Sequence, residues 1–142
     1  LTTVINIMTV ATTNYKSVTQ WYDSQDVKYQ DLYDTIVDRV PHADKWDVEQ
    51  VIEFFGELDD LGITTHQQFE DAYYSYSDSY RPEKEFAEEF YEGLGVDISN
   101  DAAPGSELWH FIDWQAVWDH SLRYDFNTIE FDGDMFFFNN NF

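Results

Sequence analysis

Acidic side chains recur at helical spacing in three segments of this chain, and their carboxylates are the first residues whose pattern suggests a chemistry. In one segment they stand at i, i+4, i+8 and i+11, and in the other two they also recur mainly at three- and four-residue steps. Neighbours at these spacings share a helix face, with Cβ atoms roughly 5–6 Å apart. Rows of fixed negative charge attract cationic side chains. These acidic rows are Asp31, Asp34 and Asp38; Glu49, Glu53, Glu57 and Asp60; and Glu85, Glu88, Glu89 and Glu92.

The acidic rows lack the basic residues that ordinarily relieve their repulsion. Like charges at these spacings destabilise a helix by a few tenths of a kcal/mol per pair, and interleaved lysines usually offset this cost. Here Lys84 is the only base in the segment of the third row, and no base follows Lys45 in the segment of the second. We therefore interpret the rows as functional charge. The competing interpretation is an acidic surface that is merely solvated.

Two patterns partly resemble metal sites, and each lacks an essential part. Glu107 and His110 have the Glu-x-x-His spacing of half a carboxylate di-iron site, but the chain has no second such pair. From Asp97 onward the chain partly follows a calcium loop, with Ala102 and Leu108 where glycine and a bidentate glutamate are required. We expect no metal and no cofactor.

No catalytic constellation is recognisable either. The chain has no cysteine, no glycine-rich phosphate loop and no nucleophile in a recognisable setting. Carboxylate pairs for acid–base work could be chosen almost anywhere among 29 acidic residues, so their presence discriminates nothing. Trp109, Trp114 and Trp118 could stack on bases, but the surrounding negative charge favours packing in a core or a dimer. We predict no catalytic residue and no enzymatic activity, with a carboxylate-based metal enzyme as a rival.

The composition indicates a folded chain whose partners are basic. It has 29 Asp and Glu against 7 Lys and Arg, a net charge of −22, while the 19% of aromatic residues argues against disorder and against adaptation to high salt. Nucleic acid and anionic lipid would repel such a chain. No apolar run approaches the roughly 18 residues of a membrane span, and the first ten residues have no basic flank. We expect no signal peptide and a cytoplasmic location.

Helices must hold the acidic rows, and apolar periodicity predicts four of them before residue 96. The first covers residues 26–40, and the second begins after a cap at Asp44 or Asp47 and ends at Gly62. The third follows a cap at Thr64 or Thr65, and the fourth begins at Pro82 and is terminated by Gly93 and Gly95. The apolar side chains expected in the third are Phe69, Ala72, Tyr73 and Tyr76, and those in the fourth are Phe86, Phe90 and Leu94.

The remaining segments add a little sheet and one more helix. The β-branched residues of segment 3–12 predict a strand. Ser106 is expected to cap a last helix that runs to about Leu122, and residues 128–131 and 135–138 flank the Asp-Gly-Asp turn of a tight hairpin. The predicted fold class is therefore α+β, mainly helical with a small antiparallel sheet and a C-terminal β-hairpin.

The C-terminal part of the chain resembles ArdA-type antirestriction proteins. The resemblance is carried by ELWHFIDWQAVWDHSLRYDF and the hairpin after it, and its most specific piece is the core Phe111-Ile112-Asp113-Trp114-Gln115-Ala116. The helical segments VEQVIEFFGEL, FEDAYYSY and FAEEFYEGLG are similar in order and acidity. Residues 1–45 do not match the family, so we divide the chain into an unmatched N-terminal strand and helix, 1–45, and an acidic antirestriction-like domain, 46–142.

The resemblance implies a homodimer, carried by a phage or mobile element, that imitates bent duplex DNA in the bacterial host cytoplasm. Such a protein evades host defence by occupying the DNA-binding cleft of a type I restriction–modification enzyme, without binding nucleic acid or membrane itself. The acidic rows would then stand in for phosphates, since 22 net charges equal about 37 Å of duplex at one charge per roughly 1.7 Å. The alternative is an acidic adaptor, or an inhibitor of a different nucleic-acid-binding protein.

Overall fold

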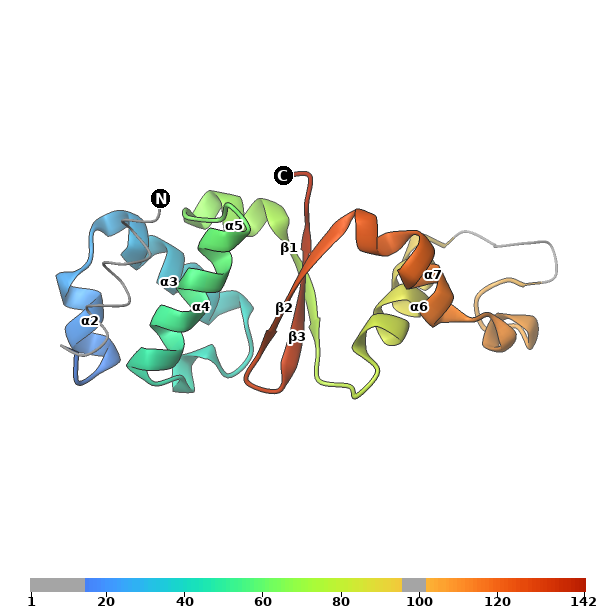
Figure 1. Ribbon diagram of the computed structural model, residues 1–142, viewed down its shortest axis with the longest axis horizontal. Coiled ribbons are helices and arrows are strands. Elements are labelled where there is room, and N and C mark those ends of the chain that lie inside the picture. Colours follow the sequence, from blue (N-terminus) through green and yellow to red (C-terminus); the bar gives the residue numbers. More distant parts are fainter. Residues whose placement is uncertain (1–14, 96–101) are drawn as a thin grey trace. The chain divides into compact units, whose positions relative to one another are not determined.

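The computed structural model describes residues 15–95 and 102–142. Within them the fold is α+β, as predicted, with six α-helices and a three-stranded antiparallel sheet whose last two strands form a C-terminal hairpin (Figure 1). The chain divides into two compact units, Leu1–Tyr74 with Asn139–Phe142, and Ser75–Phe138. The boundary predicted after residue 45 falls inside the first of these units. The strand predicted at residues 3–12 lies outside the described residues.

Capping side chains set the starts of the helices in the first unit, which are α2 (Val18–Ser24), α3 (Val27–Arg39), α4 (Val48–Asp60) and α5 (His66–Ala72). Of the two caps considered for α4 the structure selects Asp47, whose carboxylate accepts the N–H of Gln50 while the Gln50 side chain accepts the N–H of Asp47. Thr65 forms the same reciprocal capping box with Gln68 at the start of α5. Each box satisfies two donors that a helix N-terminus otherwise leaves unpaired.

Aromatic and aliphatic side chains from these helices form the core of the first unit. Trp21 of α2 meets Phe55 of α4 edge-on, with ring centroids 5.1 Å apart. Leu32 and Ile36 of α3 are also buried, and α3 packs against α5. The apolar stripe of α4 therefore faces inward, and this holds the second acidic row on its outer side.

The sheet has the order β1-β3-β2, with β1 at Tyr73–Ser77, β2 at Phe126–Phe131 and β3 at Asp134–Asn139. The predicted hairpin turn joins β2 to β3, and its Asp132 and Gly133 both have positive φ, at 52° and 84°. Two left-handed residues suit the twist of a tight hairpin, and Asp-Gly tolerates that conformation. The prediction of a C-terminal hairpin is confirmed.

Helices α6 (Pro82–Leu94) and α7 (Trp114–His120) pack together in the second unit, accompanied by short 3₁₀ turns at Leu108–Phe111 and Leu122–Tyr124. The core joins them to the sheet through aromatic rings. Phe86 stacks on Phe137 at 4.1 Å between centroids and meets Trp118 edge-on at 5.7 Å. Trp109, Trp114 and Trp118 are all buried, which confirms core packing over base stacking for these residues.

Three details of the predicted elements were wrong. Tyr76 belongs to β1 and not to the third helix, because α5 ends after Ala72 and the following Tyr/Ser segment pairs with β3. Leu94 is 53% exposed, since it is the last residue of α6 and lies beyond the buried part of its stripe. Gly93 lies inside α6, whereas Gly95, with φ of 67°, is the C-cap.

The single last helix is also a wrong prediction. The segment is a 3₁₀ turn, the short helix α7 and a second 3₁₀ turn. Ile112 is extended, and Asp113 restarts the helix by accepting the N–H of Ala116. A capping aspartate in the middle of the segment was the signal for this break.

Candidate partner-binding surface

The acidic rows lie on the three longest described helices, α3, α4 and α6. Ten of their eleven carboxylate side chains are exposed, and the remaining one, Glu88, is half-buried. The rows on α3 and α4 belong to the first unit and the row on α6 to the second. Each helix buries the opposite face, so the rows are held by packed elements.

None of the eleven carboxylates takes part in an ion pair with a described residue. Over residues 15–95 and 102–142 the structure has one ion pair, between Arg39 and Glu70 at 2.8 Å, and Glu70 is not in a row. Two row members accept hydrogen bonds from hydroxyls, Asp34 from Tyr22 at 3.0 Å and Glu85 from Ser77 at 2.8 Å. The rows therefore keep their full negative charge.

Several of the few basic side chains lie over tyrosine rings. The guanidinium carbons of Arg39, Arg81 and Arg123 lie 5.4, 5.5 and 4.6 Å from the ring centroids of Tyr73, Tyr80 and Tyr124. Lys28 lies in the same way over Tyr29, at 5.3 Å. Cation–π contacts of this kind leave the acidic rows without counter-charges.

Repulsion within a row is visible on α6. Partial burial raises the pKa of Glu89 above its ordinary value, and the charges of Glu85, Glu92 and Glu88 raise it further. A carboxylate whose neighbours are all negative binds its proton more tightly, because ionisation adds a like charge to the row. The row on α6 is therefore held together at an electrostatic cost.

The row on α3 lies beside tyrosines whose ionisation it opposes. The hydrogen bond to Asp34 is the largest cause of the raised pKa of the Tyr22 hydroxyl, and burial is the largest cause for Tyr29 and Tyr33. Nearby carboxylates add to the shift in all three. These phenols stay neutral donors at the edge of the acidic surface.

Helices α3 and α5 enclose a surface groove of about 570 Å³ with acidic walls. Asp34 and Asp38 line it from α3, and His66, Gln67 and Glu70 line it from α5. Two row members are thus brought together with a third carboxylate from another helix. The sequence pattern had assigned Glu70 no role, because it is the only acidic residue of α5 on that side.

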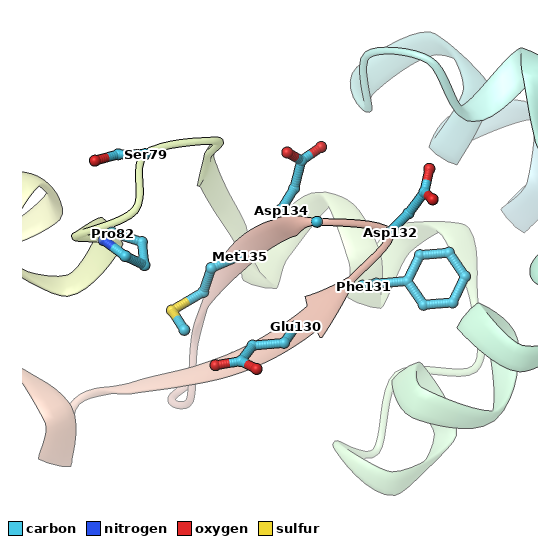
Figure 2. A pocket seen from close by; sticks show the side chains of 8 residues that line it. Ser79, Pro82, Glu130, Phe131, Asp132, Asp134 and Met135 are labelled. Atoms are coloured by element: carbon cyan, nitrogen blue, oxygen red, sulfur yellow. The ribbon is translucent and has the colours of Figure 1, made fainter.

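The acidic residues around the hairpin do not converge. Glu130, Asp132 and Asp134 line a hollow of about 320 Å³ together with Ser79 and Met135. Figure 2 shows Asp132 and Asp134 pointing to one side of the hairpin and Glu130 to the other. Among the described residues, no group of three His, Cys, Asp or Glu side chains is arranged to hold a metal ion.

The two metal patterns of the sequence gain no further ligands in the structure. Glu107 and His110 lie at the start of the 3₁₀ turn with exposed side chains. Asp97 and the rest of the calcium-like segment up to residue 101 lie outside the described residues.

Asp59 is a buried carboxylate that the sequence analysis did not single out. Its side chain is 6% exposed, and neither oxygen accepts a hydrogen bond in the described structure. It stands four residues after Phe55 on the inner stripe of α4, beside the exposed Asp60 that was assigned to a row. The four-residue step from a core phenylalanine was the signal that Asp59 faces inward.

Comparison with known proteins identifies no relative of this chain. No family model, curated protein or solved structure matches it. Within the described residues, no helix has the length and apolar character needed to cross a membrane.

Proposed function

We propose that this chain is a DNA mimic that inhibits a host enzyme by occupying its basic nucleic-acid-binding cleft. The observation that supports this most directly is the set of eleven row carboxylates, which are exposed or half-buried and have no ion-pair partner among the described residues. An ordinary solvated surface would interleave these positions with lysine. Charge that is neither neutralised nor buried is available to a partner.

The helices space the charges on the scale of a nucleic-acid backbone. A four-residue step advances about 6 Å along a helix, and the α4 row extends about 16 Å from Glu49 to Asp60. Duplex DNA carries one charge per roughly 3.4 Å of each strand, so a row is a sparser but rigid line of negative charge. Lysine and arginine side chains that track phosphates can reach such a line.

The resemblance to ArdA-type proteins supports a specific target, a type I restriction–modification enzyme in a bacterial cytoplasm. It also supports a phage or mobile-element origin and a homodimer. An inhibitor of this kind needs neither a cofactor nor contact with nucleic acid or membrane. The charge pattern alone also supports an inhibitor of another nucleic-acid-binding protein, or an acidic adaptor.

Neutralising one row tests the proposal. Replacing Glu49, Glu53 and Glu57 by Gln should lower the affinity for a purified type I enzyme about tenfold, since three exposed charge contacts of roughly 0.5 kcal/mol each amount to about one decade. The matched control replaces Asp23, Asp44 and Asp71 by Asn, which makes the same change in net charge at exposed positions of the same unit outside the rows. Equal losses in both variants would contradict a role for the row.

Competition with DNA distinguishes a mimic from an adaptor. Duplex DNA and this protein should exclude each other from the enzyme, so titrating the protein into a preformed enzyme–DNA complex should release the DNA. A stable ternary complex would exclude mimicry and support the adaptor. Binding to a different nucleic-acid enzyme, with the same exclusion, would keep the mimicry and replace the target.

A further inference from the structure

The sheet has two edge strands, and they differ in charge. In the order β1-β3-β2, β1 and β2 are each paired with another described strand on one side only. Edge strands are templates for pairing with a further chain, and proteins commonly protect them with charge. Strand β2 carries Glu130 and leads into the acidic turn, whereas the five residues of β1, Tyr-Tyr-Ser-Tyr-Ser, carry no charge.

The charge of the whole chain makes this neutral strand unusual. Two copies with a net charge of −22 each repel one another, and the acidic rows forbid contact between their helical faces. Contact between copies requires a surface where no carboxylate faces its own image. A basic partner, in contrast, gains nothing from an uncharged edge. The charge distribution therefore favours a second copy of this chain as the occupant of the β1 edge.

We infer that two copies pair along β1 in an antiparallel arrangement whose two-fold axis passes through Ser75. This deepens the homodimer of the proposed function and does not depend on the identity of the inhibited enzyme. An isologous interface places each residue opposite the one related by the axis. Ser75 then faces Ser75 of the second copy, and Tyr74 faces Tyr76 of the second copy in two equivalent pairs.

The exposure of the tyrosines fits this register. Tyr74 and Tyr76 are 48% and 38% exposed and, at alternate positions, lie on the same face of the strand. Aromatic side chains directly opposite each other stabilise antiparallel strands. Tyr76 already lies 6.2 Å from Phe136 of β3, centroid to centroid, so the new pairs would extend an existing aromatic row across the sheet.

The size of the contact sets its strength. Five-residue strands bury less surface than a permanent dimer interface requires, so the association should be reversible and dependent on protein concentration. Because the two copies repel each other, added salt should strengthen it by screening. Binding to a basic partner has the opposite salt dependence, and this separates the two interactions in one experiment.

A cysteine placed on the axis tests the register directly. The chain contains no cysteine, so Ser75→Cys introduces the only thiol. Residues directly opposite each other in antiparallel strands have Cα atoms about 4.5–5.5 Å apart, which is within the range that a disulfide spans. Under mild oxidation Ser75→Cys should form a covalent dimer much faster than Ser121→Cys, an exposed position outside the sheet. Equal rates for the two variants would overturn the register.

Charge substitutions test the interface without a covalent bond. In sedimentation velocity at high salt, Tyr74→Glu with Tyr76→Glu should abolish the concentration-dependent dimer, because it sets like charges opposite each other. The control, Tyr80→Glu with Tyr124→Glu, adds the same charge at exposed tyrosines outside β1 and should still dimerise. Tyr74→Lys with Tyr76→Glu should restore the dimer, since each introduced lysine faces an introduced glutamate of the other copy.

The outcomes separate this inference from the proposed function. If the Tyr74→Glu, Tyr76→Glu variant sediments as a monomer, keeps its circular dichroism spectrum and still displaces DNA from the enzyme, both proposals stand. A wild-type chain that is monomeric at every concentration and salt, or a dimer that all these variants leave intact, overturns β1 pairing alone. Loss of DNA displacement by the wild-type chain overturns the mimicry alone.

Discussion

At the residue scale, Glu89 shows what the acidic rows cost. Its pKa in the folded protein is raised above the ordinary value of 4.5, so the folded state holds this proton more tightly than the unfolded chain does. The free energy of unfolding therefore falls as the pH rises from about this value through the folded pKa, and it stays lower at neutral pH. Ionisation of Glu89 at neutral pH works against the fold.

Glu89→Gln should stabilise the protein at pH 7 by a few tenths of a kcal/mol, because it removes three like-charge interactions from an exposed row. The gain should disappear at pH 3, where the wild-type carboxyl is protonated. Thermal unfolding at both pH values measures the difference. Glu107→Gln, an exposed acidic residue outside the rows in the same unit, controls for net charge. An equal gain in the control would assign the effect to overall charge.

Asp59 is a second carboxylate that opposes folding. It is buried on α4 without a hydrogen bond from the described residues, and its charge contributes to the raised pKa of Tyr29. A buried polar group without a partner costs about 1–3 kcal/mol. Asp59→Asn should therefore raise the free energy of unfolding by about 1 kcal/mol or more in urea titrations at pH 7. The neighbouring, exposed Asp60→Asn should change it by less than half as much, and a destabilised Asp59→Asn would refute the assignment.

At the element scale, one aspartate supports α4 while others strain it. Asp47→Ala removes a capping box in which the side chain and backbone of Asp47 and Gln50 bond reciprocally at 2.8 and 3.0 Å. We expect a loss of about 1 kcal/mol in the free energy of unfolding, as for other caps. Asp60→Ala removes the same charge at the other end of the helix, where the dipole disfavours it, and should be neutral or stabilising. Urea unfolding of both variants decides between a cap and a pure charge effect.

The sequence predicted the elements that contain a local signal. Helix α3 matches its predicted span within one residue at each end, the Asp-Gly turn gave the hairpin, and Pro82 marked the first turn of α6. Such boundaries depend on caps and backbone dihedrals that neighbouring residues determine. The exposed positions of the row members followed from the same periodicity, because the apolar stripes fixed the opposite faces.

Elements that depend on distant partners were not predicted. The tyrosines of β1 suit a helix or a strand, and pairing with β3, more than 50 residues away, decides between them. The helix α2 was missed because one buried residue, Trp21, is too little for a periodic pattern. Glu70 and the groove it shares with α3 follow from packing between helices, which no local spacing encodes.

At the scale of the whole molecule, the charge excess is spread over both units. The 29 acidic residues divide 14 to 15 between the first and second unit, against four and three basic residues. Each unit is therefore strongly anionic by itself. Self-repulsion should affect the stability of both, and both can present charge to a partner.

Salt should consequently move stability and partner binding in opposite directions. Raising sodium chloride screens repulsion within each unit, and a relief of about 1 kcal/mol would raise Tm by roughly 4 °C for a chain of this size. The same salt should weaken binding to a basic cleft by orders of magnitude. Scanning calorimetry and binding measurements over one salt series test both, with sucrose at equal osmolality as the uncharged control. A Tm that does not respond to salt would show that the charges are compensated.

The placement of the tryptophans gives each unit its own optical signal. Trp109 and Trp114 lie 4.7 Å apart between ring centroids with planes inclined by 52°, close enough for their electronic transitions to couple. Trp21 and Trp46 belong to the first unit and contact Phe55 and Phe54 instead of another indole. Near-ultraviolet circular dichroism should therefore contain an exciton couplet from the second unit only. Its loss during denaturation, followed beside total fluorescence, would report whether the two units melt together or one after the other.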